Sequence, residues 1–220
     1  MNCVITSGDE ITEELRSGFK NYSMDKDIAQ IVSRKSKEII KSKAKNKKIK
    51  IVVTDCGIKK SILDNLIKQG CTLTVYPADV SAKEILKEKF NAVLISNGPG
   101  DPADAVKTIQ TVKELIGKIP LYGICLGYQI LSIALGAKTY KLKYGHRGGN
   151  HPVINKLTNK VMMTSQNHGY AVDVDTLPEN ASATYVNLND GTLEGFICPE
   201  LQIEAVQFRP EASPGPYDAC

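Results

Sequence analysis

The sequence predicts an α/β fold, with a mostly parallel sheet flanked by helices on both faces and a small antiparallel β portion in the C-terminal half. From residue 47 onward, short apolar runs rich in β-branched residues alternate with segments of helical spacing, which is typical of parallel sheets. After residue 160 strand-like runs follow one another directly, and Asp190-Gly191 is a hairpin signal between two of them.

The elements of the parallel part follow one another closely. Strands are expected over residues 50–54, 71–76, 92–96 and 121–124, and helices over residues 61–68, 81–89, 103–115 and after 125. Later strands are expected over 161–164, 182–188, 192–197 and 203–208. Because parallel strands end along one edge of the sheet, the loops after residues 96 and 124 should open at the same edge.

The first 46 residues do not have the composition of an independent domain. A helix is expected over residues 27–43, but large apolar residues are too few for a separate core. We interpret residues 1–46 as a lead-in or linker and place the main domain at residues 47–220.

Composition narrows the class of protein. The sequence has no apolar run of membrane-spanning length and no signal peptide, so a cytoplasmic protein without a membrane partner is expected. The six cysteines form no C-x-x-C pair, which argues against a metal site or a disulfide framework. The net charge of +4 comes mainly from a lysine-rich run at 35–50, where a solvated face is favoured over a nucleic-acid partner.

Residues 121–135 have the pattern of a nucleophile elbow. An apolar run ends at Cys125, which lies between Gly123 and Gly127 and is followed by an apolar helical pattern. The turn of an elbow strains the nucleophile and brings neighbouring chain close, so glycine is favoured at the flanking positions. A sulfur at a helix N-terminus is also favoured as a thiolate. On this segment alone, a buried core cysteine between two packing glycines is an equal alternative.

A glycine-rich loop precedes the elbow by one strand. Residues 97–101 read Asn-Gly-Pro-Gly-Asp, and the backbone N–H of Gly98 could lie close to a substrate. The N–H of Leu126, just after the cysteine, is the other natural donor for a developing oxyanion. Ordinary turn chemistry also explains such a loop when it is considered alone.

These motifs together resemble class I (triad) glutamine amidotransferases, through residues 97–101, 123–127 and 210–212. Longer stretches at 145–152, 166–172 and 210–216 are similar to the small, glutamine-hydrolysing subunit of carbamoyl phosphate synthetase. The resemblance covers about residues 50–220. It implies that the cysteine attacks the glutamine side-chain amide, forming a γ-glutamyl thioester and ammonia.

The resemblance also implies roles for individual residues. Cys125 would be the nucleophile, Glu211 would orient the base, and the N–H groups of Gly98 and Leu126 would form the oxyanion hole. The positions that contact glutamine in the family are Gly100, Gln129, Asn167, Gly169 and Tyr170. Ammonia would pass to a large synthetase subunit, which would hold the ATP and magnesium, and no cofactor is expected in this chain.

The sequence departs from the family at the catalytic base. The family has a histidine two positions before the glutamate, and this chain has Arg209 there. A guanidinium stays protonated and cannot accept a proton, so a deficit of about 10²–10⁴-fold in hydrolysis is expected. His168 is not expected to replace the base, because the family has a histidine at that position as well.

The ends of the chain differ from the family too. Residues 1–46 are interpreted as a remnant of the family's N-terminal domain, and residues 47–220 as an amidotransferase domain truncated at its C-terminus. Two alternatives to an impaired glutaminase stay open. One is an inactive scaffold that binds glutamine or a partner, and the other is a class I amidotransferase that serves a different synthetase.

Overall fold

The computed structural model describes residues 7, 10–21, 26–42, 49–212 and 215–218. The lysines at 43–48, and Ser213 and Pro214 of the C-terminal motif, lie outside the described residues.

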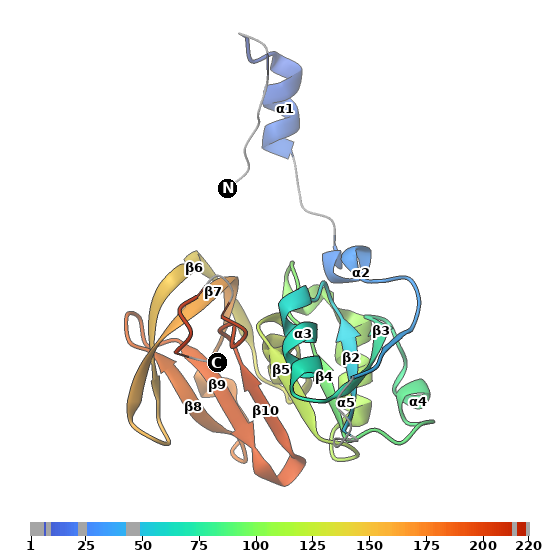
Figure 1. The fold of residues 1–220 in the computed structure, drawn as a ribbon. Helices are drawn as coiled ribbons and strands as arrows, with labels where there is room; N and C mark the ends of the chain where they lie inside the picture. The colour runs from blue at the N-terminus through green and yellow to red at the C-terminus, as the bar shows by residue number, and fades with distance from the viewer. Residues whose placement is uncertain (1–6, 8–9, 22–25, 43–48, 213–214, 219–220) are drawn as a thin grey trace.

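Ten strands within the described residues form one mixed sheet. The parallel half contains β2 (Lys50–Asp55), β3 (Thr72–Pro77), β4 (Ala92–Ile95), β5 (Leu121–Ile124) and β10 (Ile203–Val206). The antiparallel strands are β1 (Glu38–Ile40), β6 (Thr139–Asn155), β7 (Lys160–Val172), β8 (Ser182–Asn187) and β9 (Leu193–Cys198). The order across the sheet is β1-β3-β2-β4-β5-β10-β9-β8-β6-β7, which confirms the predicted α/β class (Figure 1).

Helices cover both faces of the parallel half because its strands are apolar on both sides. Helix α3 (Lys60–Lys68) packs on one face, in a cluster that includes Val53 of β2. The opposite face is covered by α4 (Ala82–Ile85), α5 (Val106–Leu115) and α6 (Leu126–Ala134), in a cluster that includes Val52. Adjacent residues of β2 thus face opposite layers, as the two-residue period of a strand requires.

The pairing of β5 with β10 determines which segments meet at the edge of the sheet. The two strands run parallel, with Ile124 opposite Val206, and the N–H of Cys125 donates to the carbonyl of Val206 at 2.9 Å. The chain that follows β10 therefore leaves the sheet beside Cys125. This places residues 207–211 next to the elbow.

The antiparallel half is larger than the sequence indicated. Strands β8 and β9 form the hairpin predicted at Asp190-Gly191. Strands β6 and β7 form a long ribbon with register shifts between Lys141 and His146 and between Gly148 and His151. Short 3₁₀ turns are η1 (Pro102–Asp104), η2 (Val174–Thr176) and η3 (Pro199–Leu201).

Some predicted elements were wrong or incomplete. The helix expected over 27–43 is only α2 (Ile28–Val32), and Ile39 and Ile40 instead belong to β1, which pairs antiparallel with β3. An open sheet edge gave these residues a partner that helical spacing does not reveal. The helix expected over 81–89 ends at Ile85, strand 161–164 extends through β7, and β6 was not predicted at all.

Helix α1 (Glu13–Asn21) stands apart from the rest of the molecule (Figure 1). It has acidic residues in its first turn, where their negative charges interact favourably with the positive end of the helix dipole. None of the helices described here has the length and apolar character needed to cross a membrane.

Candidate active site

Cys125 occupies the sharp turn between β5 and α6. Its backbone has φ 55° and ψ −105°, an unusual conformation for a residue with a side chain, as expected of an elbow nucleophile. A Cβ on Gly123 would lie 2.7 Å from the Gly127 carbonyl oxygen, and a Cβ on Gly127 would lie 2.0 Å from the Ile95 carbonyl oxygen. Neighbouring backbone thus comes so close to Gly123 and Gly127 that neither position has room for a side chain.

The thiol of Cys125 is buried, with 3% of the residue exposed. Burial raises the pKa of Cys125 to about 11, although the charge of Arg209 and a hydrogen bond from the Leu126 N–H act to lower it. The expectation of a favoured thiolate at the helix N-terminus is therefore wrong for this arrangement, because desolvation outweighs both favourable effects. At neutral pH the sulfur carries its proton and needs a base to remove it.

The glycine loop after β4 lies against the elbow. A Cβ on Gly98 would lie 2.0 Å from the Cys56 carbonyl oxygen and 2.8 Å from Cδ2 of Leu126, so only glycine fits there. Gly100 has φ +100°, a conformation that side chains rarely adopt. The two residues expected to supply oxyanion donors, Gly98 and Leu126, thus lie side by side.

Residues expected to contact glutamine line the same region. The Sγ of Cys125 lies 3.9 Å from the carbonyl oxygen of Asn167 in β7. The buried amide of Gln129 donates to the carbonyl of Tyr170 at 2.8 Å. Burial, and after it the nearby Asp101 of the glycine loop, raise the pKa of Tyr170. Gly169 lies between these residues, on β7.

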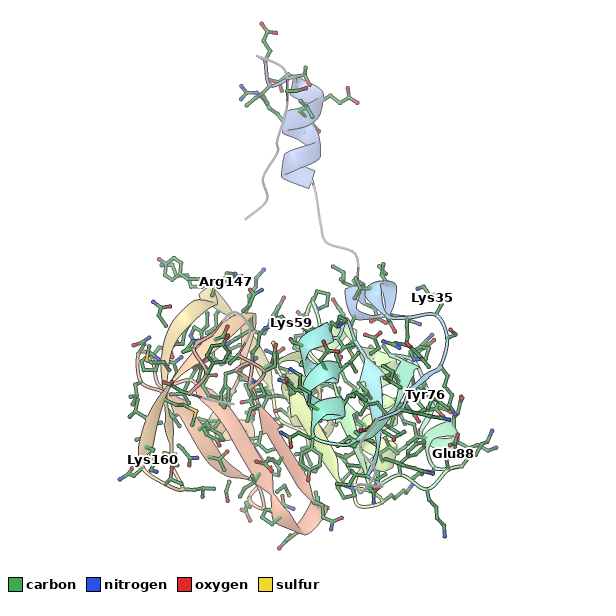
Figure 2. The ribbon with its side chains drawn as sticks, viewed as in Figure 1. Lys35, Lys59, Tyr76, Glu88, Arg147 and Lys160 are labelled. Carbon is green, nitrogen blue, oxygen red and sulfur yellow. The ribbon has the colours of Figure 1, made fainter. Side chains whose placement is uncertain are left out.

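The segment after β10 contains Arg209 and Glu211, the residues expected at two of the triad positions. Nη1 of Arg209 lies 3.4 Å from Oε1 of Glu211, whose side chain is buried. Nζ of Lys59 lies 3.6 Å from the same oxygen. Figure 2 shows Lys59 at the start of α3, between that helix and the antiparallel half. The carboxylate that would orient a histidine is instead paired with two cations.

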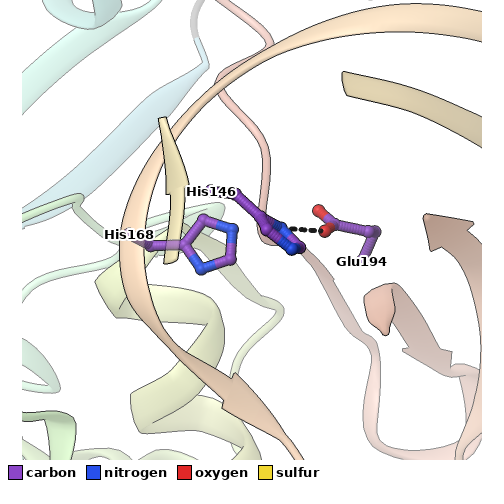
Figure 3. Close-up of side chains that lie close together, drawn as sticks. All are labelled: His146, His168 and Glu194. Carbon is purple, nitrogen blue, oxygen red and sulfur yellow. Dashed lines mark ion pairs between the residues drawn. The ribbon is translucent and has the colours of Figure 1, made fainter. Parts of the chain in front are cut away.

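A second buried polar cluster lies on the antiparallel strands. It contains His146 of β6, His168 of β7 and Glu194 of β9 (Figure 3). Nδ1 of His146 lies 3.3 Å from Oε1 of Glu194, and Nε2 of His146 lies 2.8 Å from Oδ2 of Asp190. These contacts, first that with Glu194, raise the pKa of His146 to about 9, whereas burial lowers the pKa of His168 to about 3.

Sequence reasoning missed several of these contacts. Lys59 and Gln207 were not singled out, although Lys59 contacts Glu211 and Gln207 accepts a 2.8 Å hydrogen bond from Gln129. Glu194 was also missed, and its signal was a carboxylate within a predicted strand of otherwise apolar residues. Lys59 carried no such signal, because a lysine at a helix start is ordinarily solvated.

Comparison with family models gives one match over most of the chain. The model described as glutamine amidotransferase class-I matches residues 52–219. Among solved structures, a glutamine amidotransferase from Thermotoga maritima superposes with a TM-score of 0.59 and 20% identity, covering 76% of this chain and 77% of that chain. A Thermoplasma acidophilum protein described as a GMP synthase subunit gives a TM-score of 0.67 at 22% identity, covering 78% and 88%. These two likenesses concern the fold alone.

Curated sequences give higher identity. The carbamoyl phosphate synthase small chain of Methanococcus vannielii is 48% identical over 97% of this chain and 61% of its own length. That of Clostridium perfringens is 45% identical over 100% of this chain and 61% of its own length. The chloroplastic small chain of Arabidopsis thaliana is 50% identical over 79% and 40%. The chain thus spans about three fifths of the first two relatives.

Proposed function

Because this chain belongs to the class I glutamine amidotransferase family, we propose that it hydrolyses glutamine through Cys125 and releases ammonia for carbamoyl phosphate synthesis. The Cys125 thiol loses its proton to solvent, the thiolate attacks the side-chain amide carbon of glutamine, and the C–N bond breaks as solvent returns a proton to the departing ammonia. Water then hydrolyses the γ-glutamyl thioester to glutamate and restores the thiol.

The observation that carries this proposal is the backbone of Cys125. A cysteine with φ 55° between two glycines that contact neighbouring backbone is costly for a purely structural residue. We assign the oxyanion hole to the N–H groups of Gly98 and Leu126, and the contact between these two residues supports the assignment. Gln129 and Tyr170 form the wall on which we place the glutamine.

The synthetase is proposed from the relatives' names. Carbamoyl phosphate synthase small chains are 44–51% identical to this chain, which favours them over other class I amidotransferases as functional relatives. The partner would be a large synthetase subunit in the cytoplasm, which binds ATP and magnesium and consumes the ammonia. Carbamoyl phosphate would then serve arginine and pyrimidine synthesis.

We propose that Arg209 limits the rate at which this chain hydrolyses glutamine. Its guanidinium cannot take the proton of Cys125 or return one to ammonia. With the pKa of the thiol at about 11, the unassisted thiolate is a minor species at neutral pH. Hydrolysis should therefore be slow but should still depend on the elbow.

A second candidate function follows from the same position. Oε1 of Glu211 is paired with Arg209 and Lys59 rather than with a histidine. The chain would then bind glutamine, or a synthetase subunit, without hydrolysing the amide. Binding without turnover would distinguish this function from the first.

The test measures ammonia release and glutamine binding on the full chain. Glutaminase activity should be detectable above a Cys125→Ser control, and denatured samples should contain a γ-glutamyl adduct that hydroxylamine removes. Heat of glutamine binding without adduct or ammonia would favour the scaffold. Absence of binding, adduct and ammonia, alone and with a large subunit, would exclude both.

A further inference from the structure

We propose that the buried cluster of His146, His168 and Glu194 is a binding site for one divalent cation of the zinc class. An imidazole nitrogen of each histidine and a carboxylate oxygen of Glu194 lie within 4.8 Å of one another, from three different strands (Figure 3). Two histidines and one carboxylate form an established zinc ligand set. The cluster contains none of the residues assigned to the triad, and the proposal does not depend on the glutaminase activity.

The side-chain oxygen of Gln166 offers a fourth possible metal ligand, between the two histidines. Oε1 of Gln166 is 2.8 Å from Nδ1 of His146 and 2.9 Å from Nε2 of His168. Zinc bonds of about 2.0–2.2 Å place tetrahedral ligand atoms roughly 3.3 Å apart, a spacing between the 2.8 Å contact of Gln166 with His146 and the 4.8 Å that bounds the histidine and Glu194 atoms. All four side chains belong to buried residues, and a closed site of this kind would be structural rather than catalytic.

The outer nitrogens of both histidines are already held. Nε2 of His146 contacts Oδ2 of Asp190 at 2.8 Å, and Nδ1 of His168 contacts the carbonyl oxygen of Tyr170 at 2.8 Å. Metal-binding histidines usually donate their second N–H to a carboxylate or a backbone carbonyl in this way. The arrangement directs the other nitrogen of each ring toward the centre of the cluster.

The hydrogen bonds also leave two acceptors facing each other. The Thr164 hydroxyl donates to the His151 carbonyl, so its oxygen must accept from Nε2 of Gln166, which directs Oε1 of Gln166 toward His168. Because a carbonyl only accepts, Nδ1 of His168 carries the hydrogen that Tyr170 receives, and the lone pair of Nε2 faces Oε1. A cation bound to both atoms would replace this repulsion with two favourable contacts.

Glu194 provides an independent indication of a missing ligand. Its exposed fraction is 0%, and its Oε2 has no hydrogen-bond partner among the described residues. A buried carboxylate oxygen without a partner is costly, and such groups in proteins are usually paired or bound to metal. A divalent cation would satisfy this charge.

The test uses the full chain after chelation and dialysis. Zinc chloride titrated calorimetrically should bind with one equivalent and raise the unfolding temperature. Cobalt chloride should give visible ligand-field bands without a thiolate charge-transfer band. Glu194→Gln, which preserves shape, and His146→Asn should weaken zinc binding by at least about 100-fold.

Two matched controls define the outcome. His151→Asn removes a ring that stacks on His146 at 5.0 Å without supplying a ligand, and Cys125→Ser removes a competing thiol, so both should still bind zinc. The proposal is overturned if the parent chain binds no stoichiometric metal, if binding survives both ligand substitutions, or if Cys125→Ser abolishes it. No metal uptake would assign the cluster to a proton-linked network centred on His146. If the ligand variants do not fold by circular dichroism, the cobalt spectrum of the parent chain decides.

Discussion

Replacing Arg209 with histidine should increase glutamine hydrolysis. The carboxylate that would orient an imidazole is in place, because Oε1 of Glu211 lies 3.4 Å from Nη1 of Arg209. The segment leaves β10 beside Cys125, whose N–H donates to Val206. A neutral imidazole at this position can accept the thiol proton and deliver it to ammonia, which a guanidinium cannot do.

The size of the effect follows from the protonation of Cys125. With a pKa of about 11, roughly one molecule in a thousand carries the thiolate at pH 8. A base that removes the proton during attack avoids this penalty of about 10³, which lies within the usual 10²–10⁴-fold range of general acid–base catalysis. We therefore expect Arg209→His to increase kcat/KM by about 10³-fold.

The assay is ammonia release from glutamine at pH 8, with and without a large subunit. Arg209→Gln is the matched control, because it removes the positive charge without supplying a base, and it should be no faster than the parent chain. The reasoning is refuted if Arg209→His is no faster than Arg209→Gln while both bind glutamine. It is also refuted if the parent chain already equals Arg209→His, since another group must then serve as the base.

Three further predictions concern Cys125, Gly127 and Asp55. Alkylation of Cys125 by iodoacetamide should accelerate about tenfold per pH unit up to about pH 11, because burial keeps the thiol protonated; a plateau near pH 8 would contradict this. Gly127→Ala should destabilise the protein by at least about 3 kcal/mol in urea unfolding, since the new Cβ would lie 2.0 Å from the Ile95 carbonyl oxygen, whereas Gly18→Ala, with open space around it, should not. Burial opposes ionisation of Asp55, but hydrogen bonds from Ile58, Arg34 and Gly57 hold its pKa below the usual value. Ionised Asp55 therefore stabilises the folded protein above about pH 4, and this stabilisation is lost as pH falls through the folded pKa. Asp55→Asn should lower the free energy of unfolding by about 2–3 kcal/mol at pH 7 and by progressively less in acid, as urea unfolding at several pH values would show.

The parallel half could be predicted because its signals are local. Each strand from β2 to β5 is a short apolar run with a turn after it, and the elbow is contained in residues 121–135. The edge strand β1 could not be predicted in this way, because Ile39 and Ile40 have the spacing of a helix and only the exposed edge of β3 makes them a strand. Tertiary pairing outweighed a weak local preference.

The ribbon of β6 and β7 was harder to predict from the sequence for a different reason. Its first strand contains Gly145, Gly148 and Gly149, which are typical of loops, and its register shifts interrupt the alternation of a regular strand. The contact of His146 with Glu194 depends on how this irregular ribbon brings His146 to β9, from which β8 separates it in the sheet. The candidate active site was easier to predict from its motifs, yet the pKa of Cys125 depends on burial, which its motif does not encode.

The contacts of Gly98 and Gly127 have a consequence for how this site can change. The carbonyl group of Cys56 lies directly against Gly98, and that of Ile95 lies directly against Gly127, so main-chain atoms make the shortest contacts at both glycines. Side chains around the sulfur can therefore be exchanged without moving the backbone that holds it. A lineage that lost the base would keep the scaffold of the nucleophile, and one substitution could restore the reaction. One added methyl group at either glycine, by contrast, would displace the whole turn.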